Sequence, residues 1–244
     1  LGRVANYLSF ALSSFLYLVL NAKKDDIIYV YHPPITVGIT ACLIKLFIGP
    51  KIILDIQDFW PDTLAATGFI KNKFILRLIG FFCNVVYKRS DYLLVLSKGF
   101  KEKLINMGLC KDNISVIYNW ADDEEAYLNY SNTDTANKLL NPESFNILHA
   151  GNIGPAQGLE SLVKAAKILK NKGNNNIQFI FLGDGVSAKK LKKYAKEINS
   201  NVLFLPRVDS KSARVFMEEA DVMCVHLIND PLFKITIPSK IQAY

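Results

Sequence analysis

Short, unbroken runs of apolar residues alternate with longer amphipathic stretches along most of the chain. Apolar runs of this length predict buried parallel strands, and the amphipathic stretches between them predict helices. In the first half we expect strands at 27–31, 51–56, 92–96 and 114–117 and helices at 36–46, 73–89 and 98–107. In the second half we expect strands at 145–149, 177–182, 202–204 and 222–225 and helices at 158–170, 186–198 and 211–220. This alternation predicts an α/β fold of doubly wound parallel sheets, each covered on both faces.

A polar stretch at 129–143, rich in Asn, Ser, Thr and Asp, interrupts the alternation before it starts again. Such a composition between two periodic regions indicates a linker. We therefore predict a first Rossmann-like domain at 1–128, a linker at 129–145 and a second Rossmann-like domain at 146–244. The two domains are expected to face each other across a cleft.

The segment at 4–22 carries no charge and approaches the ~20 residues that span a bilayer. Asn6, Ser9 and Ser13 recur at helical spacing and give it a mildly polar stripe, which favours a buried or surface helix over a transmembrane one. A helix lying on the membrane surface stays open as an alternative. The segment lacks the basic leader and cleavage site of a signal peptide, and we expect the chain to be part of a longer protein.

Composition narrows the classes of protein to consider. Hydrophobic residues make up 50% of the 244 and charged residues 21%, which excludes a disordered or low-complexity chain. The four cysteines are scattered without paired spacing, which argues against a zinc site or a disulfide scaffold and indicates a reducing compartment. The net charge of +7 comes mostly from residues 146–244, which carry 14 basic and 8 acidic side chains. This asymmetry predicts an anionic ligand for the second half.

Ligands of open parallel sheets bind at the carboxyl ends of the strands, so the residues that follow each strand are the candidates for chemistry. Gly151, Gly154 and Gly158 surround a helix start after the strand at 145–149. They predict either a phosphate-binding turn or a tight turn that needs glycine for its backbone conformation, and spacing leaves both open. Neither GxGxxG nor GxxxxGK[ST] occurs, which argues against a nicotinamide dehydrogenase and a P-loop ATPase.

Carboxylates mark a strand end in the first half. Asp58 and Asp62 flank an aromatic pair after the strand at 51–56, where a carboxylate could accept a proton from a hydroxyl or could cap a helix. His32 precedes two prolines and is interpreted as a turn residue more readily than as a base. No Ser/His/Asp or Cys/His pattern of a hydrolase stands out.

The strand-end segments, taken in order, resemble those of the retaining glycosyltransferases of family 4, which have the two-Rossmann GT-B fold. The segments are DIQDFWPD (55–62), VLSKGFKEKLINMGLCKDNISVIYNWAD (95–122), HAGNIGPAQGLESLVKAAKIL (149–169), FIFLGDG (179–185), NVLFLPRV (201–208), EEADVMCVHL (218–227) and IPSKIQAY (237–244). The last is similar to a subgroup that builds bacterial surface polysaccharides, including colanic-acid and N-acetylfucosamine transferases.

The resemblance implies transfer of a sugar, with retention, from a nucleotide diphosphate, expected to be UDP, to a hydroxyl of a lipid-linked saccharide, without a metal or other cofactor. It implies a catalytic role for Asp58 as a base, with Gln57 beside it. The implied acceptor contacts are His32, Trp60, Asp62 and Ser97. The implied donor contacts are Gly151, Asn152, Gly154, Gln157, Gly183, Gly185, Arg207, Val208, Ser239, Lys240 and Gln242.

The implied setting is the cytoplasm, with the protein peripheral on the inner face of the plasma membrane. The apolar segments at 4–20 and 74–89 lie beside basic residues, among them Lys88 and Arg89, which suits a membrane surface. Basic residues are not interleaved with aromatic ones, so no nucleic-acid partner is expected.

The sequence also departs from the family. Asn152 and Gln157 stand where the family has the Arg and Lys of its diphosphate loop, and Ile235 and Ala243 stand where it has a Glu pair. Ser239 and Lys240 are expected to supply the diphosphate contacts instead, with Gln242 reaching the ribose. The departures leave an alternative open, a non-catalytic α/β module that binds sugar nucleotides. An epimerase or a phosphorylase-like protein is a weaker alternative.

Overall fold

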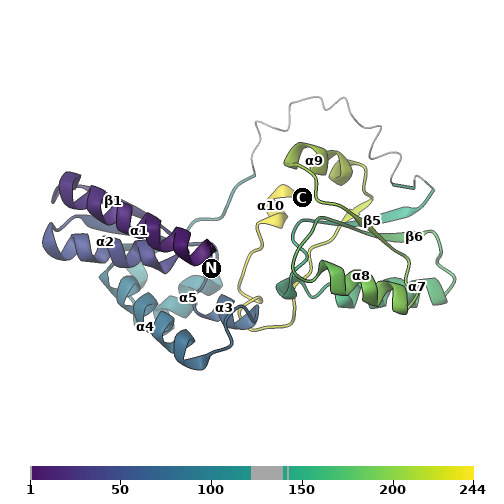
Figure 1. The fold of residues 1–244 in the computed structure, drawn as a ribbon, viewed down its shortest axis with the longest axis horizontal. Coiled ribbons are helices and arrows are strands. Elements are labelled where there is room, and N and C mark those ends of the chain that lie inside the picture. Colours follow the sequence, from purple (N-terminus) through teal and green to yellow (C-terminus); the bar gives the residue numbers. More distant parts are fainter. Residues whose placement is uncertain (1, 122–139, 142) are drawn as a thin grey trace. The chain divides into compact units, whose positions relative to one another are not determined.

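The computed structural model describes residues 2–121, 140, 141 and 143–244, and the chain divides into two compact units (Figure 1). Unit 1 comprises Leu1–Asn119 together with Asp230–Ile237, and unit 2 comprises Trp120–Asn229 together with Pro238–Tyr244. Each unit holds one four-stranded parallel sheet. The linker expected at 129–145 lies mostly outside the described residues.

The sheet of unit 1 contains four parallel strands in chain order: β1 (Ile27–His32), β2 (Lys51–Ile56), β3 (Tyr92–Val95) and β4 (Ile114–Val116). Its helices are α1 (Gly2–Asn21), α2 (Ile35–Phe47), α3 (Asp62–Ala66), α4 (Lys73–Arg89) and α5 (Lys98–Asn106), with a 3-10 turn at Lys111–Asn113. The strands and longer helices expected from the sequence are confirmed to within two residues. The short helix α3 begins at Asp62, where the sequence left a helix cap open, but its N-cap residue is Pro61 and no side-chain cap hydrogen bond forms.

Strand β2 forms the centre of the unit 1 core. Three of its side chains have no exposed surface: Ile52, Leu54 and Ile56. A strand with a neighbour on each side and a cover on each face needs apolar side chains pointing both ways, which its unbroken apolar sequence provides. Tyr87 of α4 and Phe100 of α5 are almost completely buried in the same cluster. Leu232 joins this cluster from the segment Asp230–Ile237.

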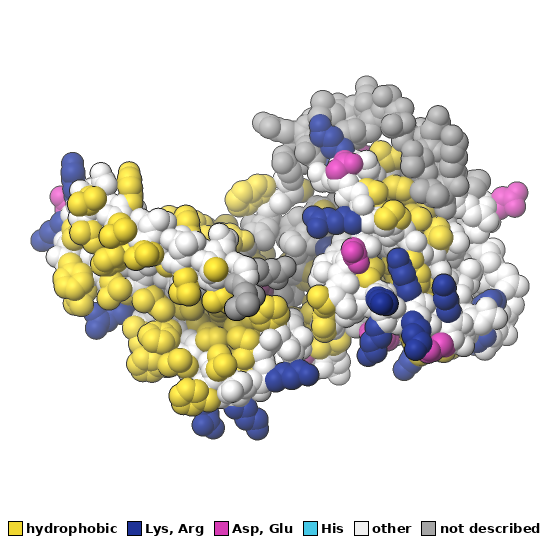
Figure 2. All heavy atoms as spheres, viewed as in Figure 1, with side chains coloured by type: hydrophobic (Ala, Val, Ile, Leu, Met, Phe, Trp, Pro, Cys, Tyr) yellow, Lys and Arg dark blue, Asp and Glu magenta, His cyan; other side chains and the backbone are white. Residues whose placement is uncertain are grey.

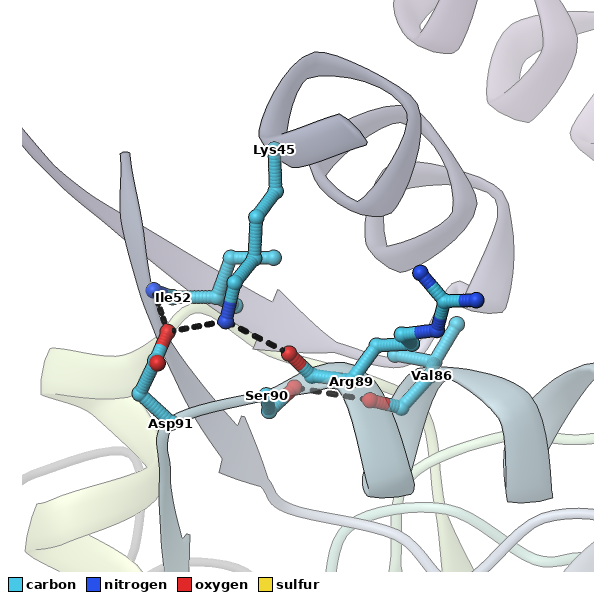
Figure 3. A network of polar contacts seen from close by, with 6 residues as sticks. All are labelled: Lys45, Ile52, Val86, Arg89, Ser90 and Asp91. Atoms are coloured by element: carbon cyan, nitrogen blue, oxygen red, sulfur yellow. Dashed lines mark hydrogen bonds and ion pairs between the residues drawn. The ribbon is translucent and has the colours of Figure 1, made fainter. Parts of the chain in front are cut away.

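A polar cluster holds α2 and α4 to the sheet of unit 1 (Figure 3). The Asp91 carboxylate accepts hydrogen bonds from Lys45 Nζ at 2.6 Å and from the Ile52 backbone N–H at 2.8 Å. Lys45 also donates to the Arg89 carbonyl at the end of α4, at 2.9 Å. Burial opposes ionisation of Asp91, but the hydrogen bonds from Lys45 and Ile52 outweigh it and hold the pKa of Asp91 below its usual value.

The sheet of unit 2 is also parallel, with strand order β7-β6-β5-β8. Its strands are β5 (Phe145–Ala150), β6 (Ile177–Leu182), β7 (Val202–Leu205) and β8 (Val222–Met223), and its helices are α7 (Glu160–Asn171), α8 (Ala188–Glu197), α9 (Ser210–Glu218) and α10 (Lys240–Ala243). The adjacent residues Ile180 and Phe181 of β6 belong to different buried clusters. Strand β6 is therefore buried on both faces, as the sequence predicted.

The start of α7 differs from the sequence expectation. The helix expected from residue 158 begins at Glu160, and a 3-10 turn at Pro155–Gln157 precedes it. Gly158 ends that turn with φ +55°, and a Cβ there would lie 2.7 Å from Ile228 Cγ2. Gly158 thus serves the turn through its left-handed backbone and its lack of a side chain.

Helix α1 packs along α2 and leaves much of its apolar surface exposed. Thr36 and Thr40 of α2 donate side-chain hydrogen bonds to the α1 carbonyls of Tyr7 and Ala11. The exposed large apolar side chains of α1 are Val4, Leu8, Phe10, Leu12, Leu16, Tyr17, Val19 and Leu20. The window Val4–Asn21 is long and apolar enough to cross a membrane by length and composition, with a mean hydropathy of 1.4. The structure therefore contradicts the interpretation of this segment as a buried helix.

Apolar side chains are also exposed on α4, namely Phe74, Ile75, Leu78 and Phe81. Figure 2 shows hydrophobic side chains gathered over the region of α1, α2 and α4, with Lys and Arg side chains at its edges. Contiguous apolar surface of this kind on a protein marks an interaction site more often than chance exposure does.

Candidate nucleotide site

Two glycine turns meet at the carboxyl ends of β5 and β6. Gly151 and Gly183 have φ values of +123° and +140°, which side-chain-bearing residues rarely adopt. A Cβ on Gly183 would lie 2.1 Å from the Gly151 carbonyl oxygen, and one on Gly185 would lie 2.4 Å from the Ile153 carbonyl oxygen. The two turns can approach this closely only because these positions are glycine.

The N–H groups of the glycines in these turns already have partners inside the protein. Gly151 N–H donates to the Leu182 carbonyl at 2.8 Å, and Gly185 N–H donates to Asp184 Oδ1 at 2.7 Å. Gly154 N–H donates to Gln157 Oε1 at 3.0 Å. The positive φ of Gly151 fits the tight-turn interpretation, whereas Gly154 has an ordinary φ of −121°. Contact of these glycines with a phosphate stays a prediction.

A pocket of about 310 Å³ opens beside the glycine turns. Its lining combines apolar side chains with polar and charged ones, a combination typical of small-ligand sites. The lining residues are Ala150, Gly151, Asn152, Leu182, Gly183, Asp184, Arg207, Val208, Ala213 and Met217. Five of the donor contacts predicted from the sequence lie together in this pocket: Gly151, Asn152, Gly183, Arg207 and Val208.

Lys240 lies over the glycine turn next to this pocket. A Cβ on Gly151 would be 2.8 Å from Lys240 Cε, so the glycine also makes room for the lysine side chain. Lys240 Nζ is 3.0 Å from His149 Nε2. Burial lowers the pKa of Lys240 to about 8, so the ammonium is mostly protonated near neutral pH.

Tyr244 anchors the helix that carries Lys240. Its hydroxyl contacts both backbone groups of Ala150 at the end of β5, accepting from N–H at 2.9 Å and donating to the carbonyl at 2.8 Å. The sequence analysis did not single out His149, Tyr244 or Asp184 as site residues. Their relation to Lys240 and Gly151 arises only when β5, β6 and α10 come together in the fold.

The remaining predicted donor residues have local roles in the structure. Gln157 Oε1 accepts from Gly154 N–H, and Asn152 Nδ2 lies 3.4 Å from the same oxygen. Ser239 stands at the N-terminal boundary of α10 and is exposed. The Gln242 side-chain amide lies beside the Pro238 and Ser239 carbonyls, to which its nitrogen donates. The roles of these side chains toward a nucleotide stay predictions.

In unit 1, a chain of side-chain hydrogen bonds links β1 and β2 to the segments that follow β2 and β4. Tyr29 Oη donates to Asp55 Oδ2 at 2.6 Å, and Gln57 Nε2 donates to Asp55 Oδ1 at 2.7 Å. Asn119 Nδ2 in turn donates to Gln57 Oε1 at 3.3 Å. Both ends of the Gln57 amide are thus engaged, which fixes its side chain beside Asp58. Burial raises the pKa of the half-buried Asp58 carboxyl.

The predicted acceptor residues cluster near these strand ends. His32 is fully buried between the rings of Trp60 and Tyr87, and burial lowers its pKa to about 4, so it is neutral. Asp62 pairs with Lys103 at 3.0 Å. The Ser97 hydroxyl accepts from the Phe100 backbone N–H and donates to the Ile235 carbonyl. These contacts give all four residues a structural part, and their contact with an acceptor stays a prediction.

Metal-ligating side chains do not gather in the part of the chain that the structure describes. Within 2–121, 140, 141 and 143–244, no group of three or more His, Cys, Asp and Glu could hold a metal ion. The four cysteines are free thiols, of which Cys110 is exposed.

Residues 131–232 match the family model described as "Glycosyl transferases group 1". A curated relative, the probable glycosyltransferase WbjE of Pseudomonas aeruginosa, is 25% identical over 91% of this chain and 56% of its own length. The putative colanic acid biosynthesis glycosyl transferase WcaI of Escherichia coli K12 is 27% identical over 84% of this chain and 52% of its own length. The chain spans about half the length of these curated relatives.

Solved structures share the fold at lower sequence identity. HepE of Anabaena, solved in complex with UDP, superposes with a TM-score of 0.66 at 14% identity, over 87% of this chain and 55% of that chain. The α,α-trehalose 6-phosphate synthase of Burkholderia multivorans gives a TM-score of 0.69 at 13% identity, over 94% and 57%. The GT-B fold expected from the sequence is confirmed.

Proposed function

We propose that this protein is a glycosyltransferase that moves a sugar from a UDP-sugar to a hydroxyl group. The observation that carries the proposal is the pocket of unit 2, which apolar side chains and Arg207 line beside two glycine turns, with the Lys240 side chain against Gly151. A structural neighbour with the same fold is solved with UDP. The family match and the curated relatives support a transferase.

The donor end of the reaction follows from the chemistry of this pocket. Val208, Ala213 and Met217 of the pocket offer apolar contacts for a flat base, and Lys240, which lies against Gly151, offers a cation for the diphosphate. A cation placed beside the leaving diphosphate lowers the barrier by stabilising the charge that develops as the glycosidic bond breaks. Amine and guanidinium donors can do this without a metal, so we propose metal-independent transfer.

The acceptor end is proposed for the strand ends of unit 1. Asp58 is the candidate base, because burial raises its pKa and thereby its affinity for a proton from a hydroxyl. Gln57, fixed by Asp55 and Asn119, lies next to it. A lipid-linked saccharide as acceptor, and retention of configuration, rest on the resemblance to the polysaccharide-building subgroup. A non-catalytic module that binds nucleotide sugars is the second candidate, favoured by Ile235 and Ala243 in place of the family's Glu pair.

Calorimetric titration with UDP tests the donor site. Lys240→Ala is expected to weaken UDP binding by about 1.5–3 kcal/mol, as for a lost hydrogen bond to a charged group. Lys189→Ala, on the exposed surface of α8, is the matched control and should leave the affinity unchanged. UDP affinity equal to wild type in Lys240→Ala would remove Lys240 from the site. UDP release from a panel of UDP-sugars separates the two candidate functions, because the binding module gives none.

We further propose that the apolar surface of α1 and α4 binds an anionic membrane, as we expected from the apolar segments that lie beside basic residues in the sequence. Lys88 and Arg89 at the end of α4 are exposed, and each basic residue near a lipid surface contributes roughly 1 kcal/mol. Sedimentation with anionic vesicles at low salt should exceed that with neutral vesicles, and Lys88→Glu with Arg89→Glu should remove the difference. Lys189→Glu with Lys190→Glu, on α8, is the control pair. Equal binding to both vesicle types would reject the membrane surface and leave the transferase proposal intact.

A further inference from the structure

The charge of Lys240 is not neutralised by a carboxylate in the described part of the chain. The ion pairs there join Lys45 with Asp91, Lys103 with Asp62 and Lys193 with Glu197, and none of them includes Lys240. The Lys240 ammonium is half-buried, so water only partly compensates its charge. A half-buried cation without a carboxylate partner attracts an anion more strongly than a cation that is paired with Asp or Glu.

The partner that orients Lys240 is an uncharged histidine. His149 is fully buried at the end of β5, and the ring of Phe181 lies edge-on to it at 6.1 Å. Its Nδ1 is 3.1 Å from the Cys224 carbonyl oxygen. A carbonyl can only accept a hydrogen bond, so Nδ1 carries the proton and Nε2 keeps a lone pair. That lone pair accepts from the Lys240 ammonium at 3.0 Å.

The other neighbour of Nε2 does not change this assignment. The Asn152 carbonyl lies 3.5 Å from Nε2, at the outer limit of a hydrogen bond, and it too can only accept. Burial, and after it the charge of Lys240, lowers the pKa of His149 to about 4, so the ring stays neutral under physiological conditions. The contact therefore directs the ammonium without cancelling its charge.

We propose that His149 is a positioning residue that holds the Lys240 ammonium over Gly151, with its charge available to the diphosphate of the nucleotide. The proposal rests on the proposed function for its ligand, and on the described contacts for the His149–Lys240 pair. An Asp or Glu in place of His149 would hold the lysine equally well but would neutralise it. A neutral acceptor whose tautomer is fixed by Cys224 avoids that loss.

Other titratable groups surround the pair and belong in the interpretation of any pH dependence. His226, in the segment after β8, is close enough to contribute electrostatically to the lowered pKa of His149, and its Nδ1 is 2.6 Å from the Gln157 carbonyl. The Cys224 thiol is half-buried, and burial raises its pKa. Tyr244 faces Ala150 from α10, and Asp184 and Arg207 line the pocket beyond Gly151.

The first test measures UDP and uridine binding in two variants of matched size. His149→Leu removes the acceptor and should weaken UDP binding about tenfold, with little change for uridine, which lacks phosphate. His149→Gln keeps an acceptor and should restore most of the loss. In a Lys240→Ala background, His149→Leu should add nothing further. Equal losses for UDP and uridine, or additive losses with Lys240→Ala, would mean that His149 only supports the fold.

The second test does not depend on nucleotide binding. Lys240, labelled by reductive methylation with ¹³C, is titrated by NMR between about pH 7 and pH 11 in each variant. Loss of the acceptor should lower the pKa of Lys240 in His149→Leu, because the charged form loses a hydrogen bond, and His149→Gln should restore it. An unchanged titration in His149→Leu overturns the proposal. If wild-type protein does not bind UDP but the pKa still falls, the proposed function fails while the pairing stands.

Discussion

Asp91 provides a test of which force holds the helices of unit 1 to its sheet. The carboxylate makes an ion pair with Lys45 and also accepts from the backbone N–H of Ile52, which has no exposed surface. The two side chains of the ion pair are 29% and 31% exposed, so the pair alone contributes about 0–1 kcal/mol. A buried N–H left without its acceptor costs about 1–3 kcal/mol. The backbone contact should therefore dominate.

Three substitutions separate the two contributions. Asp91→Ala removes both contacts and should lower the free energy of unfolding by about 2–3 kcal/mol. Asp91→Asn keeps an oxygen that can accept from Ile52 and should cost about 1 kcal/mol, as should Lys45→Met, which leaves the carboxylate in place. Asp91→Asn and Lys45→Met each retain the acceptor for the Ile52 N–H, which Asp91→Ala removes.

Urea unfolding followed by tryptophan fluorescence measures these differences. Trp60 is half-buried in unit 1, whereas Trp120 is 80% exposed and should respond weakly. The expected order of stability is wild type first, then Lys45→Met and Asp91→Asn together, then Asp91→Ala. Equal losses in all three variants would show that the ion pair, and not the backbone contact, supplies the stability.

Three further outcomes are expected. Folding lowers the pKa of Asp91, so the stability that this carboxylate contributes is present above the ordinary carboxyl pKa of 3.8 and is lost as pH falls through the lower folded value. The unfolding curves of wild type and Asp91→Asn should therefore converge in acid. Gly183→Ala should abolish UDP binding and destabilise unit 2 well beyond the roughly 1 kcal/mol expected for Gly173→Ala, because Gly173 also has a positive φ but has open space for a Cβ. Equal effects of the two variants on thermal unfolding would contradict the steric argument. Tyr244→Phe loses both hydrogen bonds to Ala150, which should lower the free energy of unfolding of unit 2 by about 1–2 kcal/mol and weaken UDP binding. An unchanged UDP affinity by calorimetry would show that α10 needs no such anchor.

The strands were predictable because their apolar runs reflect burial on both faces. Ile52, Leu54 and Ile56 alternate with residues that face the other side of the same covered strand, so the pattern of β2 has one interpretation. The extent of helix α3 could not be predicted, since five residues after Trp60 and Pro61 are too short for a helical period to show. The exposure of α1 was not decided by its sequence either, because an apolar helix has the same composition whether it is covered or not.

The candidate site was only partly predictable. Glycines after β5 and β6 signalled a turn, but spacing could not show that the two turns lie in contact, with the N–H groups of Gly151 and Gly185 bonded inside the protein. The pairing of His149 with Lys240 had no sequence signal, because 91 positions separate the two residues. Contacts between distant segments depend on the order of strands in the sheet, which residue spacing does not contain.

The units of this protein are not continuous pieces of chain. The segment Asp230–Ile237 belongs to unit 1: its Leu232 lies in the unit 1 core, and its Ile235 carbonyl accepts a hydrogen bond from Ser97. The chain then returns to unit 2, where Lys240 lies. A protease that cuts once after Asn119 would thus leave two fragments still joined by packing, since one of them contributes to the interior of the other. An expression fragment that stops before Asp230 would lose part of the unit 1 core along with the lysine. Reshuffling of these units between related proteins has to exchange two segments together, and a single crossover cannot do so.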